Sequence, residues 1–160
     1  MSDGGTAVTA PITRGSDWWD CWFLGLARYH ASASKDPSTR VGAVIVRPDR
    51  IVVASGFNGF PRGIADTDAR LADRPTKYQL VVHAEMNALL QAGWQAAGCT
   101  LYSWPLAPCE RCAAHIAQAG IVRVVAPGVR EDFAGTPAIL GEAGVGFDIV
   151  SLVMAGGAKP

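Results

Sequence analysis

The stretch HAEMNALLQAGWQAAGCTLYSWPLAPCERC, residues 83–112, contains the pattern on which the fold prediction depends. Its first part, 83–95, is compatible with a helix in composition and spacing, and the apolar run 100–104 that follows Gly98 predicts a short strand. A second helix is predicted over 109–119. Because helix, strand and helix follow one another directly, this stretch predicts a layered α/β fold in which helices cover a sheet.

The same alternation continues on both sides of this stretch. The remaining predicted elements are a helix over 17–34 that Ser16 caps, strands over 41–47 and 51–55 joined by a turn at 48–50, a strand over 121–126, a helix over 137–143 and a strand over 147–153. Five strands covered by helices predict a three-layer α/β/α fold with a mixed sheet. Ligands of such sheets gather at strand ends and adjacent helix starts.

Size and composition favour a single domain. We expect it over 16–154, with loosely packed tails at 1–15 and 155–160. The sequence is 49% hydrophobic and 18% charged, which suffices for a substantial core. Its formal net charge of zero argues against a large surface for DNA or RNA. No apolar run reaches the length of a membrane span and residues 1–14 lack a secretion signal, so we expect a cytoplasmic location.

Three residues of the opening stretch have the chemistry of a catalytic zinc site. His83, Cys109 and Cys112 offer one imidazole and two thiolates, and a site with three such ligands keeps a fourth position open for water. Zinc lowers the pKa of that water to about 7, so hydroxide is available at neutral pH. Glu85 lies two residues after the histidine and is not needed to hold the metal, which predicts a role in proton transfer.

A structural zinc site or a redox pair is the alternative interpretation of Cys109 and Cys112. A structural site requires a fourth protein ligand, and His115 is the best candidate because it follows Cys112 on the same predicted helix. The other candidates are Cys21, Cys99 and His30. A closed site would leave Glu85 and Pro108 without explanation, so the catalytic interpretation is preferred.

The predicted first helix is unusually rich in aromatic residues. Trp18 and Trp22 share a face with Leu26, and Trp19 and Phe23 widen that face beyond an ordinary core stripe. We prefer a core face that continues into the subunit interface of a homo-oligomer to a surface for base stacking.

The segment 64–80 is polar and carries most of the clustered charge of the chain, including Lys77. A solvated insertion and a lid or effector loop are both compatible with this composition, and the sequence does not separate them.

Taken together, these motifs resemble those of the cytidine deaminase superfamily, and within it most closely the deoxycytidylate (dCMP) deaminases. His-x-Glu followed by Pro-Cys-x-x-Cys is typical of zinc nucleobase deaminases. The resemblance extends over about 18–144, and its landmarks are Lys35-Asp36-Pro37, 41–46, Gly56-Phe57-Asn58-Gly59, Pro61-Arg62-Gly63, Thr76-Lys77-Tyr78, 83–88, 108–112 and Ala119-Gly120-Ile121. It implies the cytidine deaminase-like fold, with zinc bound by His83, Cys109 and Cys112 and with Glu85 as the proton shuttle.

Substrate contacts are also expected from the resemblance and from the chemistry of a phosphate monoester. The candidates are Asn58, Ala84 and Trp104 in the pocket, and Arg40 and Arg130 at a phosphate, with Lys77 and Arg62 behind them. The family's Gly-Tyr-Asn-Gly loop is tied to regulation by dCTP and dTTP with Mg²⁺. Phe57 replaces that tyrosine here, so a hydroxyl contact of the effector is missing.

The predicted reaction is the hydrolysis of the pyrimidine nucleotide dCMP to dUMP and ammonia, a step of nucleotide metabolism, by zinc hydroxide attack at C4 with Glu85 shuttling protons. The alternative is the same chemistry on another small nucleoside, base or modified nucleotide. The segment 102–109, which is about one residue longer than usual and contains Trp104, supports this alternative. A deaminase of bases within nucleic acid and a non-catalytic zinc module are less favoured.

Overall fold

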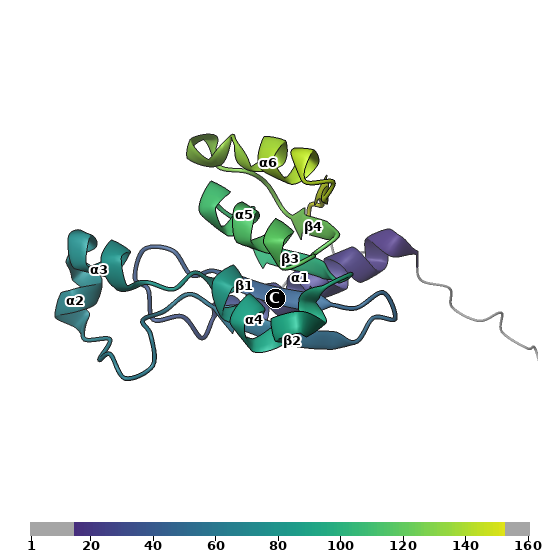
Figure 1. Cartoon of the computed structure of the whole chain (residues 1–160). Coiled ribbons are helices and arrows are strands. Elements are labelled where there is room, and N and C mark those ends of the chain that lie inside the picture. The colour runs from purple at the N-terminus through teal and green to yellow at the C-terminus, as the bar shows by residue number, and fades with distance from the viewer. Residues whose placement is uncertain (1–14, 153–160) are drawn as a thin grey trace, which may run out of the picture.

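Five strands form one mixed sheet in the computed structural model, which describes residues 15–152 (Figure 1). The strands are β1 (Gly42–Val46), β2 (Val52–Phe57), β3 (Thr100–Trp104), β4 (Arg123–Ala126) and β5 (Gly146–Ile149). Their order across the sheet is β2-β1-β3-β4-β5. β1 is antiparallel to both of its neighbours, whereas β3, β4 and β5 are parallel. The predicted mixed five-stranded sheet is confirmed.

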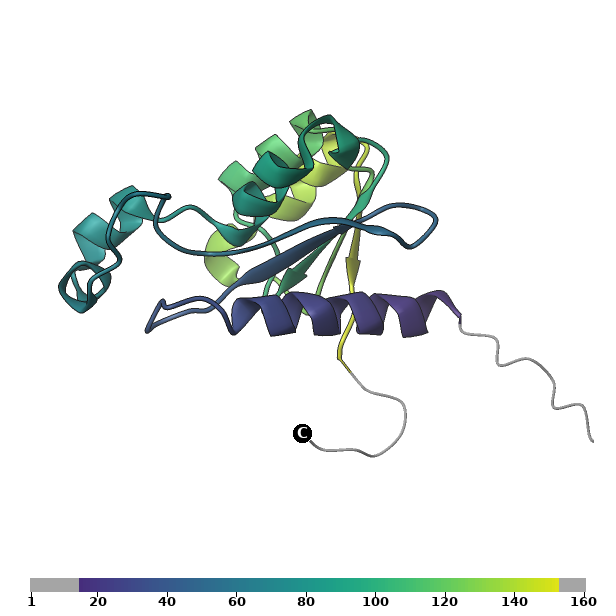
Figure 2. The same cartoon turned by 90° about the horizontal axis from the view of Figure 1, so that it is seen from below.

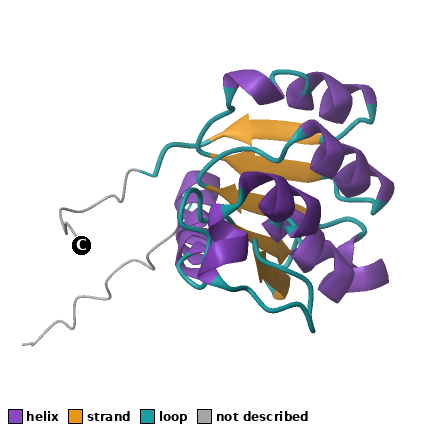
Figure 3. Ribbon diagram, turned by 90° about the vertical axis from the view of Figure 1, so that its left-hand side faces the viewer, coloured by secondary structure: helices purple, strands orange, loops and turns teal. Residues whose placement is uncertain are grey.

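Helices cover both faces of this sheet. The principal helices are α1 (Ser16–Ala31), α4 (Ala84–Ala92), α5 (Glu110–Gln118) and α6 (Thr136–Glu142). Figure 2 shows α1 along one face and the other three on the opposite face, and Figure 3 shows the strands between these layers. This is the three-layer α/β/α arrangement that the sequence predicts. None of the described helices combines the length and the apolar character that crossing a membrane requires.

The two faces of the sheet bury different sets of side chains because successive strand residues point in opposite directions. Val44 and Tyr102 pack with Phe23 and Leu24 of α1 in one cluster. The residues that alternate with them, such as Ile45 and Leu101, pack with α4 and α5 in a second, larger cluster. All five residues of β1 are buried, as expected for a strand that is covered on both sides. The alternation places Ser103 on the face of α4 and α5.

Two glycines allow the helices to approach the sheet closely. A Cβ atom at Gly42 would collide with the backbone of α1 at Ala27. A Cβ atom at Gly56 would collide with the backbone of α4 at Ala84 and lie 2.7 Å from the backbone nitrogen of Ala88. The sequence alone indicated neither contact.

The boundaries of several elements differ from the predicted ones. Gly15 is the N-cap residue of α1, and Ser16 is already helical and makes no side-chain capping bond. The helix predicted over 83–95 becomes α4 followed by a short 3₁₀ helix, η1 (Gly93–Ala96). Another short 3₁₀ helix, η2 (Glu131–Phe133), follows β4. The predicted tails at 1–15 and 155–160 lie outside the described residues, apart from Gly15.

The polar segment 64–80 folds into two short helices, α2 (Asp68–Ala72) and α3 (Arg74–Leu80). They project from the body of the molecule at the left of Figure 1. Thr67 and Asp73 accept hydrogen bonds at the starts of these helices from the backbone N–H groups of Arg70 and Thr76. Lys77 of α3 is only 3% exposed, so this lysine belongs to the packed structure and is not a solvated charge.

Candidate active site

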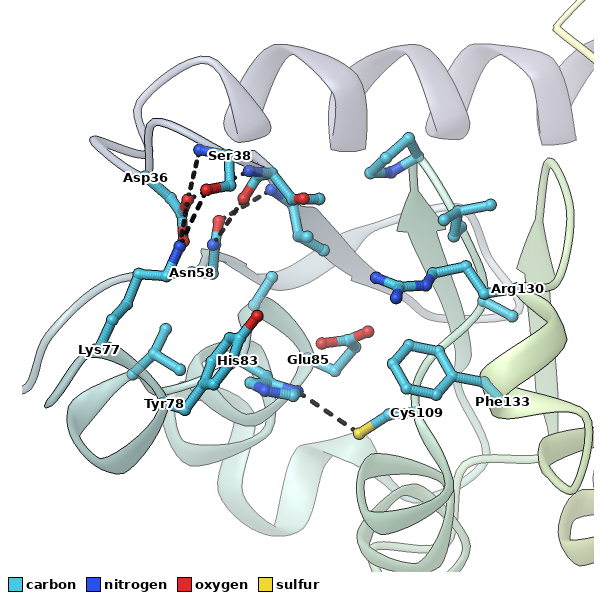
Figure 4. A pocket seen from close by; sticks show the side chains of 17 residues that line it. Asp36, Ser38, Asn58, Lys77, Tyr78, His83, Glu85, Cys109, Arg130 and Phe133 are labelled. Atoms are coloured by element: carbon cyan, nitrogen blue, oxygen red, sulfur yellow. Dashed lines mark hydrogen bonds and ion pairs between the residues drawn. The ribbon is translucent and has the colours of Figure 1, made fainter. Parts of the chain in front are cut away.

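The starts of α4 and α5 bring the three predicted metal ligands together. His83 is the N-cap residue of α4, Cys109 is the N-cap residue of α5, and Cys112 lies in the first turn of α5. The Nδ1 atom of His83 is 3.5 Å from Sγ of Cys109 (Figure 4) and 3.3 Å from Sγ of Cys112. One ligand atom from each residue lies within 4.8 Å of the others, which is the convergence that a metal site needs.

Backbone and side-chain contacts hold both helix starts in place. Val82, directly before His83, exchanges two backbone hydrogen bonds with Gly59, of 2.8 and 3.1 Å. Pro108, directly before Cys109, accepts a hydrogen bond from the buried hydroxyl of Thr136 at 2.8 Å. Residues far apart in the sequence therefore fix the directions in which the ligands point.

The electrostatics of the three residues fit a divalent cation. The pKa of Cys109 is lowered to about 3 by the neighbouring thiol of Cys112 and by the imidazole of His83, although burial acts in the opposite direction. The pKa of Cys112 is raised, first by Cys109 and then by burial. Two adjacent thiolates repel each other unless a cation lies between them. The set of one imidazole and two thiols therefore matches the ligand preferences of zinc.

His115, the candidate fourth ligand of a structural zinc site, does not join this cluster. Its Nδ1 lies 2.6 Å from the backbone carbonyl oxygen of Arg111, one helical turn earlier. Within residues 15–152, one group of three or more histidine, cysteine or acidic side chains could hold a metal ion. It consists of His83, Cys109 and Cys112.

Glu85 lies in the first turn of α4, directly beside these residues. It is 3% exposed and lines the same cavity as His83 and Cys109 (Figure 4). Its Oε1 lies 3.2 Å from the hydroxyl oxygen of Ser103. Burial raises the pKa of this carboxyl group, and the hydrogen bond from Ser103 opposes that rise. A buried carboxyl group beside the metal ligands has the position that a general acid–base group needs.

The cavity next to these residues has a volume of about 190 Å³. Of the predicted substrate contacts, Asn58, Ala84, Arg130 and Lys77 line it. Arg40, Arg62 and Trp104 are not part of its lining, although Pro105, which follows Trp104 through a cis peptide bond, is.

Asn58 uses its amide group to hold the cavity wall. Its Oδ1 accepts a hydrogen bond from the backbone N–H of Val41 at 2.8 Å, and its Nδ2 donates to the carbonyl oxygen of Thr39 at 2.9 Å. Asn58 is 6% exposed. The residue therefore connects the end of β2 to the segment that enters β1, and both Thr39 and Val41 line the cavity.

Both cations of the cavity lining are paired with carboxylates. Lys77 Nζ lies 3.2 Å from Asp36 Oδ1 in a buried ion pair. Arg130 donates from Nε and Nη2 to the two carboxylate oxygens of Asp132, at 2.8 and 2.6 Å. In Figure 4 the guanidinium of Arg130 points into the cavity above Glu85. Because Asp132 occupies one edge of the guanidinium, the edge that carries Nη1 remains for a ligand.

Several lining residues have no counterpart in the sequence prediction. Asp36, Ser38, Tyr78 and Phe133 line the cavity but were not proposed as substrate contacts. The first three lie in or near the landmark runs 35–37 and 76–78, which could have drawn attention to them. Phe133 is an isolated aromatic residue at the end of η2, in the polar stretch after β4, and no periodic pattern marks it.

Comparisons with known proteins found related sequences. The family described as cytidine and deoxycytidylate deaminase zinc-binding region matches residues 17–127. A protein of Aliivibrio fischeri named as an uncharacterised deaminase in the luxG 3′ region is 45% identical over 115 residues, which cover 72% of this chain and 76% of that protein. The deoxycytidylate deaminase of Mus musculus is 41% identical over 113 residues, which cover 67% of this chain but only 63% of the mouse enzyme.

The fold has solved relatives as well. The apo structure of the dCMP deaminase from the cyanophage S-TIM5 superposes with a TM-score of 0.66 at 26% sequence identity. The superposition covers 80% of this chain and 94% of the phage enzyme. The structure of the same phage enzyme in complex with dCMP and dUMP has a TM-score of 0.70 at 23% identity, covering 86% of this chain and 99% of that one, and it supports the fold alone.

Proposed function

The chain belongs to the cytidine and deoxycytidylate deaminase family, and we propose that it catalyses the zinc-dependent hydrolysis of dCMP to dUMP and ammonia. The observation that carries this proposal is the convergence of His83, Cys109 and Cys112 within 4.8 Å, beside the buried carboxyl group of Glu85 in one cavity. Three protein ligands and one adjacent acid–base group are the set that hydrolytic deamination requires.

Each of these residues has a separate task in the proposed reaction. His83, Cys109 and Cys112 would hold zinc, which supplies a Lewis acid that lowers the pKa of a coordinated water to about 7. Glu85 would take one proton from the attacking water and deliver it to the ring nitrogen, and would then carry the second proton of the same water to the amino group, which leaves as ammonia. The buried position of Glu85 excludes bulk water, so the proton stays available for transfer within the site.

The cavity supports a small substrate. Its volume of about 190 Å³ suits a single base with part of its sugar, and Arg130 extends a guanidinium toward its centre. A phosphate monoester would accept hydrogen bonds from that guanidinium. Ala84 and Asn58 would contact the base and the sugar. Arg40 and Trp104 do not line the cavity, so they would have to contact the substrate from outside it.

A substrate panel tests the proposal. The purified protein is incubated with dCMP, deoxycytidine and dCTP in parallel, and the loss of cytosine absorbance is followed. We expect turnover with dCMP above the other two substrates, and we expect Glu85→Ala to abolish turnover while zinc content stays at the wild-type level. Loss of zinc in Glu85→Ala would contradict the roles proposed here, since it would make the carboxylate a ligand.

A second candidate is a deaminase of an uncharged nucleoside or base. The observation that favours it is that both cations of the cavity lining, Lys77 and Arg130, are already paired with carboxylates. Such a site has less affinity for a dianionic phosphate than one with a free cation. In the same panel, turnover of deoxycytidine above dCMP would establish this second candidate.

Two further properties are proposed. A homo-oligomer is supported by the apolar surface of α1, where Trp22 remains 42% exposed, and light scattering tests it. A cytoplasmic location is supported by four free cysteines, because thiolate metal sites suit reducing compartments.

Regulation by a nucleotide with Mg²⁺ stays a prediction from the resemblance. Phe57, in the place of the family's tyrosine, is 41% exposed and has no hydroxyl to offer. Turnover measured with and without dCTP or dTTP in the presence of Mg²⁺ tests this prediction.

A further inference from the structure

Ser103 forms a hydrogen bond with the carboxyl group of Glu85. It belongs to β3, the central strand of the sheet, and is fully buried. Its hydroxyl oxygen is 3.2 Å from Oε1 of Glu85 and 2.8 Å from the carbonyl oxygen of Leu106. Among the residues that the structure describes, no other side chain forms a hydrogen bond with the Glu85 carboxyl group.

The hydroxyl group has one hydrogen and two neighbouring acceptors. A serine hydroxyl donates one hydrogen bond at a time, and its oxygen can accept others. The hydroxyl oxygen of Ser103 lies within hydrogen-bond distance of both acceptors, the Leu106 carbonyl oxygen and the Glu85 carboxylate. One buried hydroxyl group therefore links the Glu85 carboxyl group to the backbone at Leu106.

We propose that Ser103 is a positioning residue for Glu85, and this inference rests on the proposed deaminase function. The bond at 3.2 Å fixes Oε1 and thereby leaves the second carboxyl oxygen for the substrate and the attacking water. The bond to Leu106 fixes the hydroxyl itself, and Leu106 and Ala107 form part of the cavity wall. Ser103 thus joins the proton-transferring group to the wall that surrounds the base.

The decisive variant is Ser103→Ala, which removes only the hydroxyl group. We expect kcat for the preferred substrate to fall about 10–100-fold, as is typical when an orienting partner of a catalytic group is removed. We expect KM and zinc content to stay close to those of the wild type, because Ser103 neither binds metal nor lines the cavity. Ser103→Thr keeps a hydroxyl group at the same position and should recover most of the lost kcat.

Tyr102→Phe is the matched control. Tyr102 is the preceding residue of the same strand, is also buried, and donates its hydroxyl to Asp20 at 2.7 Å on the opposite face of the sheet. Its loss removes one buried hydrogen bond without touching the site. We expect Tyr102→Phe to lower the unfolding temperature and to leave kcat unchanged.

Two results would overturn the inference. The first is a Ser103→Ala enzyme with wild-type kcat and a raised KM, which would show that the serine supports only the cavity wall. The second is a fall in kcat that Tyr102→Phe reproduces, which would show a general effect of stability. A wild-type protein that deaminates none of the cytosine substrates would instead contradict the proposed function itself, so the two failures are distinguishable.

Discussion

Lys77 and Asp36 form an ion pair in the wall of the cavity, with Nζ 3.2 Å from Oδ1 and side chains that are only 4% and 10% exposed. Asp36 also accepts hydrogen bonds from the backbone N–H groups of Ser38 and Thr39, at 2.7 and 3.1 Å. Lys77 also donates to the Ser38 hydroxyl at 3.1 Å. The pair connects α3 to the segment that follows α1 and fixes one end of the cavity.

We expect Lys77→Met to destabilise the protein by about 3–5 kcal/mol, because it leaves the Asp36 carboxylate buried without a counter-charge. Urea unfolding measures this loss. Lys35→Met is the control, since the ion pair of Lys35 with Asp66 at 2.9 Å is exposed and should contribute little. Equal effects of the two substitutions would contradict the structural role given to Lys77.

Gly56→Ala should push α4, which follows its N-cap residue His83 and carries Glu85, away from the sheet. The added Cβ would collide with backbone atoms of α4 at Ala84 and Ala88, and these atoms can move away only if the helix shifts. We expect the free energy of unfolding to fall by about 1–3 kcal/mol, and we expect a lower kcat.

Gly25→Ala provides the comparison for Gly56→Ala. A Cβ at Gly25 meets nothing within 4 Å, and Gly25 lies in the interior of α1. This variant should gain about 0.5–1 kcal/mol through helix propensity, with unchanged activity. Denaturant unfolding and a single activity assay measure both variants, and a tolerated Gly56→Ala would show that α4 can shift without consequence.

Stability should depend on pH through Asp20. Burial alone would raise the pKa of this carboxyl group, but hydrogen bonds from Arg123 and Tyr102 outweigh it and hold the pKa below the ordinary value of 3.8. Because this pKa is lower in the folded state, the ionised carboxylate stabilises the protein at pH values above 3.8. This stability is lost as the pH falls through the folded-state pKa. Asp20→Asn should therefore cost about 2 kcal/mol at neutral pH, and its difference from the wild type should shrink only in acid.

Urea unfolding of both proteins over a pH series tests this dependence. Asp148→Asn is the control, because Asp148 contacts Arg123 at 2.7 Å from a side chain that is 52% exposed. A difference between wild type and Asp20→Asn that stays constant down to the most acid condition would show that Asp20 is not held ionised by its partners.

Removal of zinc should abolish turnover and lower the unfolding temperature, because the metal would hold together the starts of two helices, α4 with His83 and α5 with Cys109 and Cys112. Dialysis against a chelator, followed by metal analysis and calorimetry, measures both effects, and added zinc should restore them. Cys112→Ser should lose zinc, whereas Cys21→Ser should keep it, since Cys21 lies on α1 near Ser151. Equal zinc content in the two variants would exclude this ligand set.

Arg130→Gln should raise KM for dCMP about tenfold or more, since hydrogen bonds to charged groups contribute about 1.5–3 kcal/mol. The same variant should leave the kinetics of deoxycytidine unchanged, because that substrate has no phosphate. Arg40→Gln, at an exposed position outside the cavity lining, should affect neither substrate. A larger effect of Arg40→Gln than of Arg130→Gln would assign the phosphate to the other arginine.

The order of helices and strands was predictable because it depends on local spacing. The continuous apolar run of β1 and the alternation of elements from His83 to Gly120 predicted both the sheet and the covering helices. The polar segment 64–80 was harder to interpret, since its helices depend on capping by Thr67 and Asp73 and on one buried ion pair. Composition gave no indication that a lysine in this segment would be buried.

The sequence by itself determined the kind of chemistry, because an imidazole, two thiols and a carboxylate at fixed spacings have the same ligand and acid–base properties in any compact fold. Only the tertiary structure decided which charges face the cavity. Arg130 and Lys77 line it whereas Arg40 does not, and Ser103 reaches Glu85 from a different element. These placements depend on contacts between residues far apart in the chain, and such contacts leave no local pattern in the sequence.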